Sequence, residues 1–281
     1  MKQKPTNHEP YWDLIRRIVL ESDLVLEILD ARLVELSRNK EVEDLIKESG
    51  KPLIFVINKI DLVSKSSLKE QVEKLKESGE VVFVSAKRPK DVKILLYAIR
   101  NTFKKYGKRE VVERGQFDPK PIYREVHGEI VVGVLGYPNV GKSSIINALS
   151  HKKKVKVSKK SGTTHGIHWI KATQDIKLID SPGVIPLGND DDIKYGLIGA
   201  KDSERLKDPS LVAHAVIKLF MKQGSRSFEN FYDVKFGDKD AEEIIEDLGL
   251  KKGFLVKGGE VDENRTCSII VRDWQQGRLR I

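Results

Sequence analysis

The sequence predicts an α/β fold, with a mostly parallel sheet and flanking helices, followed by a small and mainly helical region. Short apolar stretches of strand length alternate with amphipathic stretches of helical length between residues 11 and 183. Such alternation is typical of βαβ units, whose strands run parallel and whose helices cover the sheet. From about residue 195 onward, helical patterns dominate. We therefore expect two domains, residues 1–194 and 195–281.

The individual elements follow from the local patterns. Strands are predicted where short stretches are mostly apolar, at 24–29, 53–57, 81–84, 130–135 and 176–179. Helices are predicted where apolar residues recur with helical spacing, at 40–48, 67–78, 90–105, 144–149, 209–222 and 239–248. Residues 106–128 are polar and basic and include Gly107, Gly115, Pro119 and Pro121, which predicts a linker over the surface.

Composition excludes several classes of protein. The 281 residues are 39% hydrophobic and 33% charged, which excludes a disordered or collagen-like chain. No apolar run approaches the roughly 20 residues that a membrane span needs, and the polar first ten residues give no secretory signal. The single cysteine, Cys267, has no second cysteine for an internal disulfide or a zinc site. We expect a cytoplasmic monomer that does not contact membranes.

The positive charge is concentrated in the middle of the chain. The net charge is +9, and residues 101–165 alone contain 14 Lys and Arg against 5 Asp and Glu. Two interpretations stay open on charge alone. The excess is either a solvated surface or an anion-binding face, most simply one for nucleic acid.

A phosphate-binding loop is predicted at residues 136–143, which match G-x-x-x-x-G-K-S. The motif follows an apolar strand and precedes a helix, which is the context it requires. Its backbone amides and the helix N-terminus would surround a nucleotide's phosphates, with Lys142 at the β- and γ-phosphates and Ser143 on Mg²⁺. The predicted contacts are Asn139, Val140, Gly141, Lys142, Ser143 and Ser144.

Two further motifs follow strands and suit recognition of guanine. Asn58, Lys59 and Asp61 come after the strand at 53–57, and Ser85, Ala86 and Lys87 come after the strand at 81–84. In an open parallel sheet, ligands bind at the carboxyl ends of the strands. The Asp61 carboxylate can accept hydrogen bonds from the ring N–H and the exocyclic amine of guanine, whereas adenine offers an acceptor there.

Together with Asp180-Ser-Pro-Gly183, these motifs resemble the set found in translation-factor-class GTPases. The resemblance implies that Asp180 holds Mg²⁺ and that the amide of Gly183 meets the γ-phosphate. It also implies a threonine that binds the same Mg²⁺. We assign this role to Thr164, and its neighbour Thr163 stays an alternative. Lys142, Thr164 and Gly183 are the residues we expect to act in hydrolysis.

The motif order is permuted, because the guanine-reading motifs precede the phosphate loop. This order resembles the circularly permuted GTPases, and the whole chain resembles their YlqF/YawG family of ribosome-assembly GTPases. Further family-like signatures are Asp30-Ala-Arg32, residues 37–39 and residues 258–262. The resemblance implies a circularly permuted P-loop GTPase fold. Residues 195–281 then follow Gly183 closely, so we expect the nucleotide state to reorient the helical domain.

The resemblance also implies slow intrinsic hydrolysis. Val184 stands where many GTPases carry a glutamine that positions water, and its side chain cannot do so. Asn139 matches an asparagine that helps to bind K⁺ in related potassium-activated GTPases, so K⁺ is a candidate cofactor beside GTP, GDP and Mg²⁺. Three histidines, His8, His165 and His168, are alternative candidates for the group that completes the site.

Six lysines in ten residues suit contact with a phosphate backbone, although a solvated loop stays an alternative. They are Lys152, Lys153, Lys154, Lys156, Lys159 and Lys160. The resemblance makes ribosomal RNA the expected ligand, and a switch in assembly of the large ribosomal subunit the expected function. Two alternatives stay open: a GTPase that acts on tRNA or translation, and an RNA-binding module gated by nucleotide.

Overall fold

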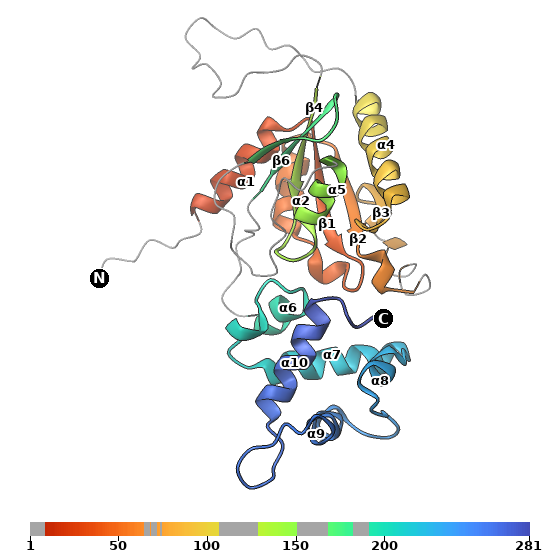
Figure 1. The fold of residues 1–281 in the computed structure, drawn as a ribbon. Helices are drawn as coiled ribbons and strands as arrows, with labels where there is room; N and C mark the ends of the chain where they lie inside the picture. The colour runs from red at the N-terminus through yellow and green to blue at the C-terminus, as the bar shows by residue number, and fades with distance from the viewer. Residues whose placement is uncertain are drawn as a thin grey trace, which may run out of the picture.

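The computed structural model describes residues 9–64, 68, 72–73, 75–106, 129–150, 168–181 and 191–281. In these stretches a six-stranded sheet carries helices on both faces. A helical region lies at the end of the sheet where the parallel strands have their carboxyl ends (Figure 1). None of the described helices combines the length and apolar character that crossing a membrane requires. Most of the predicted linker and much of the helix predicted at 67–78 lie outside these residues.

The sheet has the strand order β3-β2-β1-β4-β6-β5, with β5 antiparallel to β6 and the other pairs parallel. β1 lies in the middle, where Val25 is opposite Leu53 on one side and Leu24 is opposite Val132 on the other. The mostly parallel sheet predicted from the sequence is confirmed. The strands are β1 (Leu24–Asp30), β2 (Leu53–Asn58), β3 (Glu80–Val84), β4 (Ile130–Leu135), β5 (His168–Lys171) and β6 (Ile176–Asp180).

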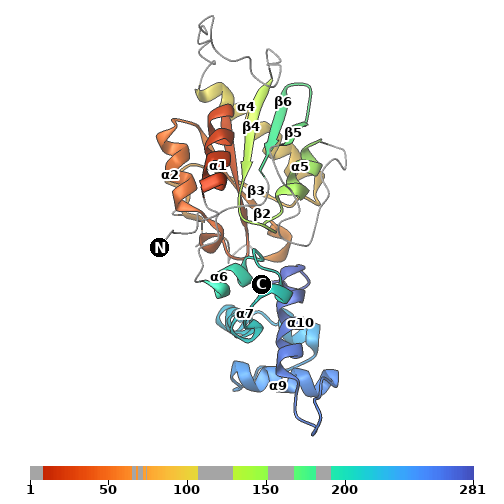
Figure 2. The ribbon, with the colours of Figure 1, turned by 90° about the vertical axis from the view of Figure 1, so that its left-hand side faces the viewer.

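Helices cover the sheet on both faces (Figure 2). On one face, α1 (Glu9–Glu21) and α2 (Lys40–Glu48) share a buried apolar cluster with strand residues such as Val25. On the other face, α4 (Pro89–Tyr106) and α5 (Lys142–Ser150) pack against strand residues such as Leu26. Because helices cover both faces of the sheet, the residues of its inner strands are mostly apolar on both sides.

In the sheet and the helices that cover it, α1 and β5 were not predicted. In α1 the apolar residues form a narrow stripe among charged neighbours, and the stripe becomes buried only against the sheet. β5 has four residues at the sheet edge, of which only Ile170 is buried. A short edge strand carries too little apolar character for its pattern to stand out in the sequence.

The chain from residue 192 onward is helical apart from 3-10 turns and connecting loops. The helices are α6 (Asp192–Leu197), α7 (Pro209–Gln223), α8 (Ser227–Tyr232), α9 (Ala241–Lys252) and α10 (Glu263–Gln275). Side chains of Asp208, Asp240 and Asp262 cap α7, α9 and α10 by accepting from backbone N–H groups of the first turn. The division predicted between residues 194 and 195 falls inside α6 and stays a prediction.

Aromatic side chains fill the core of the helical region. The Trp274 ring meets Phe220 edge-on with centroids 6.0 Å apart, and Phe228 lies 5.6 Å from Phe220. This apolar cluster is continuous with the core of the sheet, and Tyr137 and Tyr195 are among its members. Their rings lie 6.3 Å apart. The helical region therefore packs directly on the loops at the carboxyl edge of the parallel strands.

Candidate functional site

Residues from three separate sequence motifs line one cleft at the carboxyl edge of the sheet. The cleft is partly open to solvent and has a volume of about 170 Å³. It is lined by the turn after β2, the loop after β3, the start of α5 and the end of α10. The lining residues are Asn58, Lys59, Asp61, Leu62, Ser85, Ala86, Lys87, Gly141, Ser144, Gln275, Gln276 and Gly277.

Asp61 is the carboxylate of this cleft. Ser85 Oγ donates to Asp61 Oδ1 at 2.8 Å, and Lys87 Nζ donates to Asp61 Oδ2 at 2.7 Å. Burial opposes ionisation of Asp61, but the hydrogen bonds from Lys87 and Ser85 outweigh it and lower the pKa. The carboxyl is therefore ionised at neutral pH and accepts hydrogen bonds. The Lys87 side chain is 77% exposed, and an ion pair with such a partner is worth at most about 1 kcal/mol. A ligand that donates hydrogen bonds to Asp61 would therefore displace Lys87 at low cost.

Asn58 joins the two halves of the site. Its Nδ2 donates to the carbonyl of Val140 at 3.0 Å, and its Oδ1 accepts from the amide of Ala86 at 3.4 Å. The side chain packs so closely on the phosphate loop that a Cβ at Gly141 would lie 2.2 Å from Asn58 Nδ2. Gly141 also has a φ of 105°, a region that side chains disfavour. These contacts explain why glycine stands at this position of the loop.

The phosphate loop runs from β4 into α5. Lys142 is buried, and its Nζ donates to the carbonyls of Gly136 and Tyr137, both at 2.7 Å. Burial lowers the pKa of Lys142, and the negative charge of Asp180 partly opposes this. Ser143 and Ser144 lie in the first turn of α5, whose N-terminus favours anions. The ammonium group of Lys142, fixed by two carbonyls, therefore lies close to the N-terminus of α5, and both favour binding of an anion.

Asp180 is a buried carboxylate at the end of β6, where the sequence motif predicts a ligand of Mg²⁺. It is buried and lies in register with Val134 of β4 and with His168 of β5. Burial raises the pKa of Asp180, and the charges of Lys142 and His168 oppose the rise. A buried carboxylate beside a loop that carries the Ser143 hydroxyl is a donor set that Mg²⁺ prefers. The residues therefore fit this metal.

Other predicted residues lie outside the described part of the chain. These are Thr164, Gly183, the neighbouring Thr163 and Val184, the histidines His8 and His165, and the six lysines Lys152, Lys153, Lys154, Lys156, Lys159 and Lys160.

Comparisons with known proteins identify the family. A model described as 50S ribosome-binding GTPase matches residues 131–251, and one described as elongation factor Tu GTP binding domain matches residues 7–105. A GTP-binding protein of Methanocaldococcus jannaschii is 38% identical over 96% of this chain. The GDP-bound structure of YlqF from T. maritima matches with a TM-score of 0.60 and 25% identity over 94% of each chain. This chain belongs to the circularly permuted GTPases of the YlqF/YawG family.

Curated relatives of this permuted GTPase are longer than the chain itself. The Methanocaldococcus jannaschii protein is matched over 66% of its length. Nucleolar GTP-binding protein 2 of Saccharomyces cerevisiae is 33% identical over 95% of this chain and is matched over 52% of its length. The chain thus spans about half to two thirds of these relatives.

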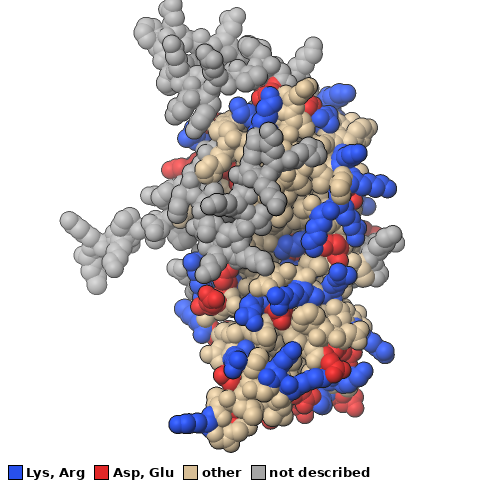
Figure 3. All heavy atoms as spheres, viewed as in Figure 1, with Lys and Arg blue, Asp and Glu red and all other residues tan. Residues whose placement is uncertain are grey.

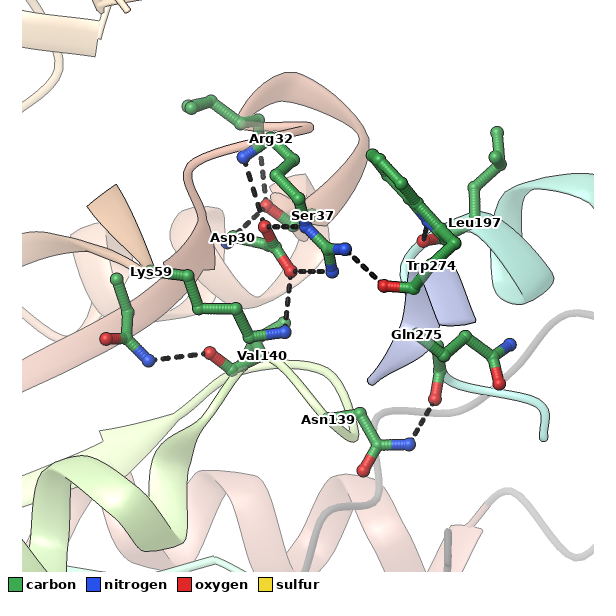
Figure 4. Close-up of polar contacts among 12 residues, drawn as sticks. Asp30, Arg32, Ser37, Lys59, Asn139, Val140, Leu197, Trp274 and Gln275 are labelled. Atoms are coloured by element: carbon green, nitrogen blue, oxygen red, sulfur yellow. Dashed lines mark hydrogen bonds and ion pairs between the residues drawn. The ribbon is translucent and has the colours of Figure 1, made fainter. Parts of the chain in front are cut away.

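In this permuted GTPase a buried ion network links the turn at residues 58–62, the predicted guanine-reading turn, to the helical region (Figure 4). Asp30 accepts from Arg32 Nη2 at 2.8 Å and from Lys59 Nζ at 2.7 Å. The Arg32 guanidinium lies over the Trp274 ring, 4.1 Å from its centroid, and Nη1 donates to the Trp274 carbonyl. Burial opposes ionisation of Asp30, yet its two cationic partners hold the pKa well below the usual range.

We expect the substitution Arg32→Ala to lower the free energy of unfolding by about 3 kcal/mol, because it removes one partner of a buried carboxylate. Chemical denaturation of both proteins measures the difference. Arg17→Ala is the matched control, since Arg17 pairs with Glu21 on the exposed face of α1 and should cost at most about 0.5 kcal/mol. A loss for Arg32→Ala no larger than that of the control would contradict this account.

The phosphate loop makes its own contacts with the helical region. Asn139 has a φ of 61°, and its Nδ2 donates to the carbonyl of Gly199. Lys194 lies over the Tyr137 ring, with its Nζ 5.5 Å from the centroid. These contacts, and the placement of Gln275–Gly277 in the cleft, were not predicted from the sequence. No motif marks them, since the residues are distant in the chain and of ordinary type. Two local patterns did mark residues that make these contacts: the Asp30-Ala-Arg32 signature and the phosphate-loop motif, which contains Asn139.

Proposed function

We propose that this chain binds GTP with Mg²⁺, hydrolyses it slowly, and acts as a switch during assembly of the large ribosomal subunit. The observation that carries the proposal is the convergence of an ionised Asp61 with the phosphate loop in a cleft that the helical region also lines. A switch requires the nucleotide site and a mobile or partner-binding part to be in contact. Contacts of Arg32 and Asn139 with the helical region supply this.

The proposed site divides the work among its residues. Asp61 reads the guanine edge, Asn58 holds the two loops together, and Lys142 neutralises charge on the β- and γ-phosphates. Ser143, Asp180 and Thr164 would hold Mg²⁺, which supplies positive charge at the phosphate oxygens when bound. The amide of Gly183 is proposed to meet the γ-phosphate. Val184 cannot orient water, which supports slow hydrolysis in the absence of a partner.

Potassium is proposed as an activating cation at Asn139. Because Nδ2 of this side chain donates to Gly199, Oδ1 is the atom left to bind a cation. If K⁺ binds to Oδ1 of Asn139, GTP hydrolysis should be faster in K⁺ than in Na⁺ at equal ionic strength.

Ribosomal RNA and pre-ribosomal particles are the proposed partners. Support comes from the description of the matched family model as ribosome-binding and from the nucleolar names of several relatives. Lys and Arg side chains are spread over one face of the molecule, with acidic side chains among them in the helical region (Figure 3). The lysine-rich segment at 152–160 adds charge suited to phosphate contacts.

The decisive experiment sediments the protein with purified large or small ribosomal subunits in the presence of a non-hydrolysable GTP analogue or GDP. Binding to the large subunit that depends on the analogue, with faster GTP hydrolysis, is the expected result. Binding to neither subunit in either state would contradict the assembly function. Stimulation by mature ribosomes but not by assembling particles would favour action in translation instead.

We expect the triple substitution of Lys152, Lys153 and Lys154 by glutamine to weaken RNA binding and to reduce its salt dependence. Each lost phosphate contact lowers the slope of log affinity against log salt by about 0.7 to 0.9, so the slope should fall by about 2 to 3. Binding to a ribosomal RNA fragment at several salt concentrations gives this slope. Substituting the exposed Lys90, Lys93 and Lys104 of α4 removes the same charge elsewhere, and equal slopes for the two triple variants would argue against a contact at 152–154.

A further inference from the structure

The end of the helical region forms one wall of the nucleotide cleft. Gln275, Gln276 and Gly277 line it together with Asp61 and Lys87, although more than 180 residues separate the two groups in the sequence. None of the GTPase motifs contains these three residues.

Backbone contacts hold the segment 275–281 against the guanine-reading turn. The amide of Ile281 donates to the carbonyl of Leu62, and the amide of Ser64 donates to the carbonyl of Ile281, both at 2.8 Å. Gly277 has a φ of 69°, and a Cβ there would lie 2.9 Å from Leu62 Cδ1. The segment thus lies directly on the residues that follow Asp61.

The two glutamines of this wall differ in what their amides do. Gln275 Nε2 donates to the carbonyls of Gly196 and Lys201, at 2.9 and 2.8 Å, which fixes the side chain to the helical region. Gln276 is exposed, and among the described residues no hydrogen-bond partner is found for its side-chain amide. An amide of this kind offers both a donor and an acceptor.

We propose that Gln276 hydrogen-bonds the nucleoside part of a bound guanine nucleotide, so that the segment 275–281 is part of the nucleotide site. The inference rests on the proposed GTP binding. The chemistry it fits is the ribose 2′-hydroxyl or the 2-amino edge of the base. Coupling is reciprocal, so a nucleotide that gains affinity from this segment also stabilises the docking of the helical region.

The test measures the dissociation constants of GDP, 2′-deoxy-GDP and IDP for the wild type and for Gln276→Ala. We expect GDP to bind about three- to tenfold more weakly to the variant, as the loss of one neutral hydrogen bond implies. The weakening should disappear with 2′-deoxy-GDP if the ribose is the partner, and with IDP if the amino edge is. Asn264→Ala removes an exposed amide at the other end of α10 and should change none of the constants.

A second pair of variants tests whether residues 275–277 form a wall of the nucleotide cleft, without changing the side chain of Gln276. Gly277→Val pushes the segment away from Leu62, and we expect GDP affinity to fall about tenfold. Gly224→Val is the matched control, because Gly224 ends α7 with a φ of 62° and a Cβ there would meet nothing within 4 Å. It introduces the same backbone strain without touching the cleft.

Three results would overturn the inference. These are unchanged GDP binding by Gln276→Ala, an equal loss for all three nucleotides, and equal effects of the two glycine substitutions. Failure of the wild type to bind GDP would be a different outcome, since it would overturn the proposed function itself.

Discussion

Replacing Lys142 with alanine should lower GTP hydrolysis at least about 100-fold, the scale of losing one charged or hydrogen-bonding group that stabilises a transition state. The expected size follows from how Lys142 is held. It is buried beneath the phosphate loop, two backbone carbonyls fix its ammonium group, and burial there lowers its pKa without removing the charge at neutral pH. A fixed positive charge in a site shielded from water acts more strongly on phosphate oxygens than a solvated one.

Phosphate release under single-turnover conditions measures the effect, because it separates chemistry from product release. Lys47→Ala, on the exposed face of α2, should leave the rate unchanged and controls for the loss of a lysine in general. If Lys142→Ala kept more than about a tenth of the wild-type rate, the assignment of the phosphate loop would have to be abandoned.

Asp61→Asn should change which base the protein accepts. In the proposed complex the carboxylate would accept two hydrogen bonds from guanine, whereas an asparagine would place an N–H donor opposite the guanine amine. A site that loses a required hydrogen-bond match rejects the ligand by about 10⁴-fold, and we expect GTP affinity to fall by up to this factor. Xanthine carries a carbonyl where guanine carries the amine, so xanthine nucleotides should gain affinity.

Competition between labelled GDP and unlabelled XDP gives both affinities in one experiment. The exposed Asp44 of α2 makes a matched control, since Asp44→Asn changes the same group away from the cleft. Unchanged preference for guanine in Asp61→Asn would show that another residue reads the base.

Most of the sheet could be predicted because its strands are buried on both faces. Leu26 and Val56 lie in strands that are almost entirely buried, so apolar residues dominate both strands, and only Glu27 interrupts the run at 24–29. The nucleotide site could be predicted for a related reason, since its motifs are short and contiguous. The structure brings Asp61, Lys87 and Gly141 to one cleft, as their positions after parallel strands imply.

The contacts between the sheet and the helical region could not be predicted. Arg32 meets Trp274 across 242 positions of the chain, and Asn139 meets Gly199 across 60. Contacts of this kind depend on how whole elements dock, which local patterns do not encode. We expected the helical region to sense the nucleotide through the segment after Gly183. The structure adds direct contacts with the phosphate loop and with the guanine-reading turn.

The central place of β1 bears on how the protein folds during its own synthesis. One edge of β1 pairs with β2, which follows it closely, but the other pairs with β4, more than 100 residues later. As the chain emerges from the N-terminus, the guanine-reading half is made first and keeps an open apolar edge until residues 130–135 arrive. The cleft is finished later still, when Ile281 reaches Leu62. The wall of the cleft at residues 275–277 therefore comes into place only after the strands that carry the rest of the cleft have been made.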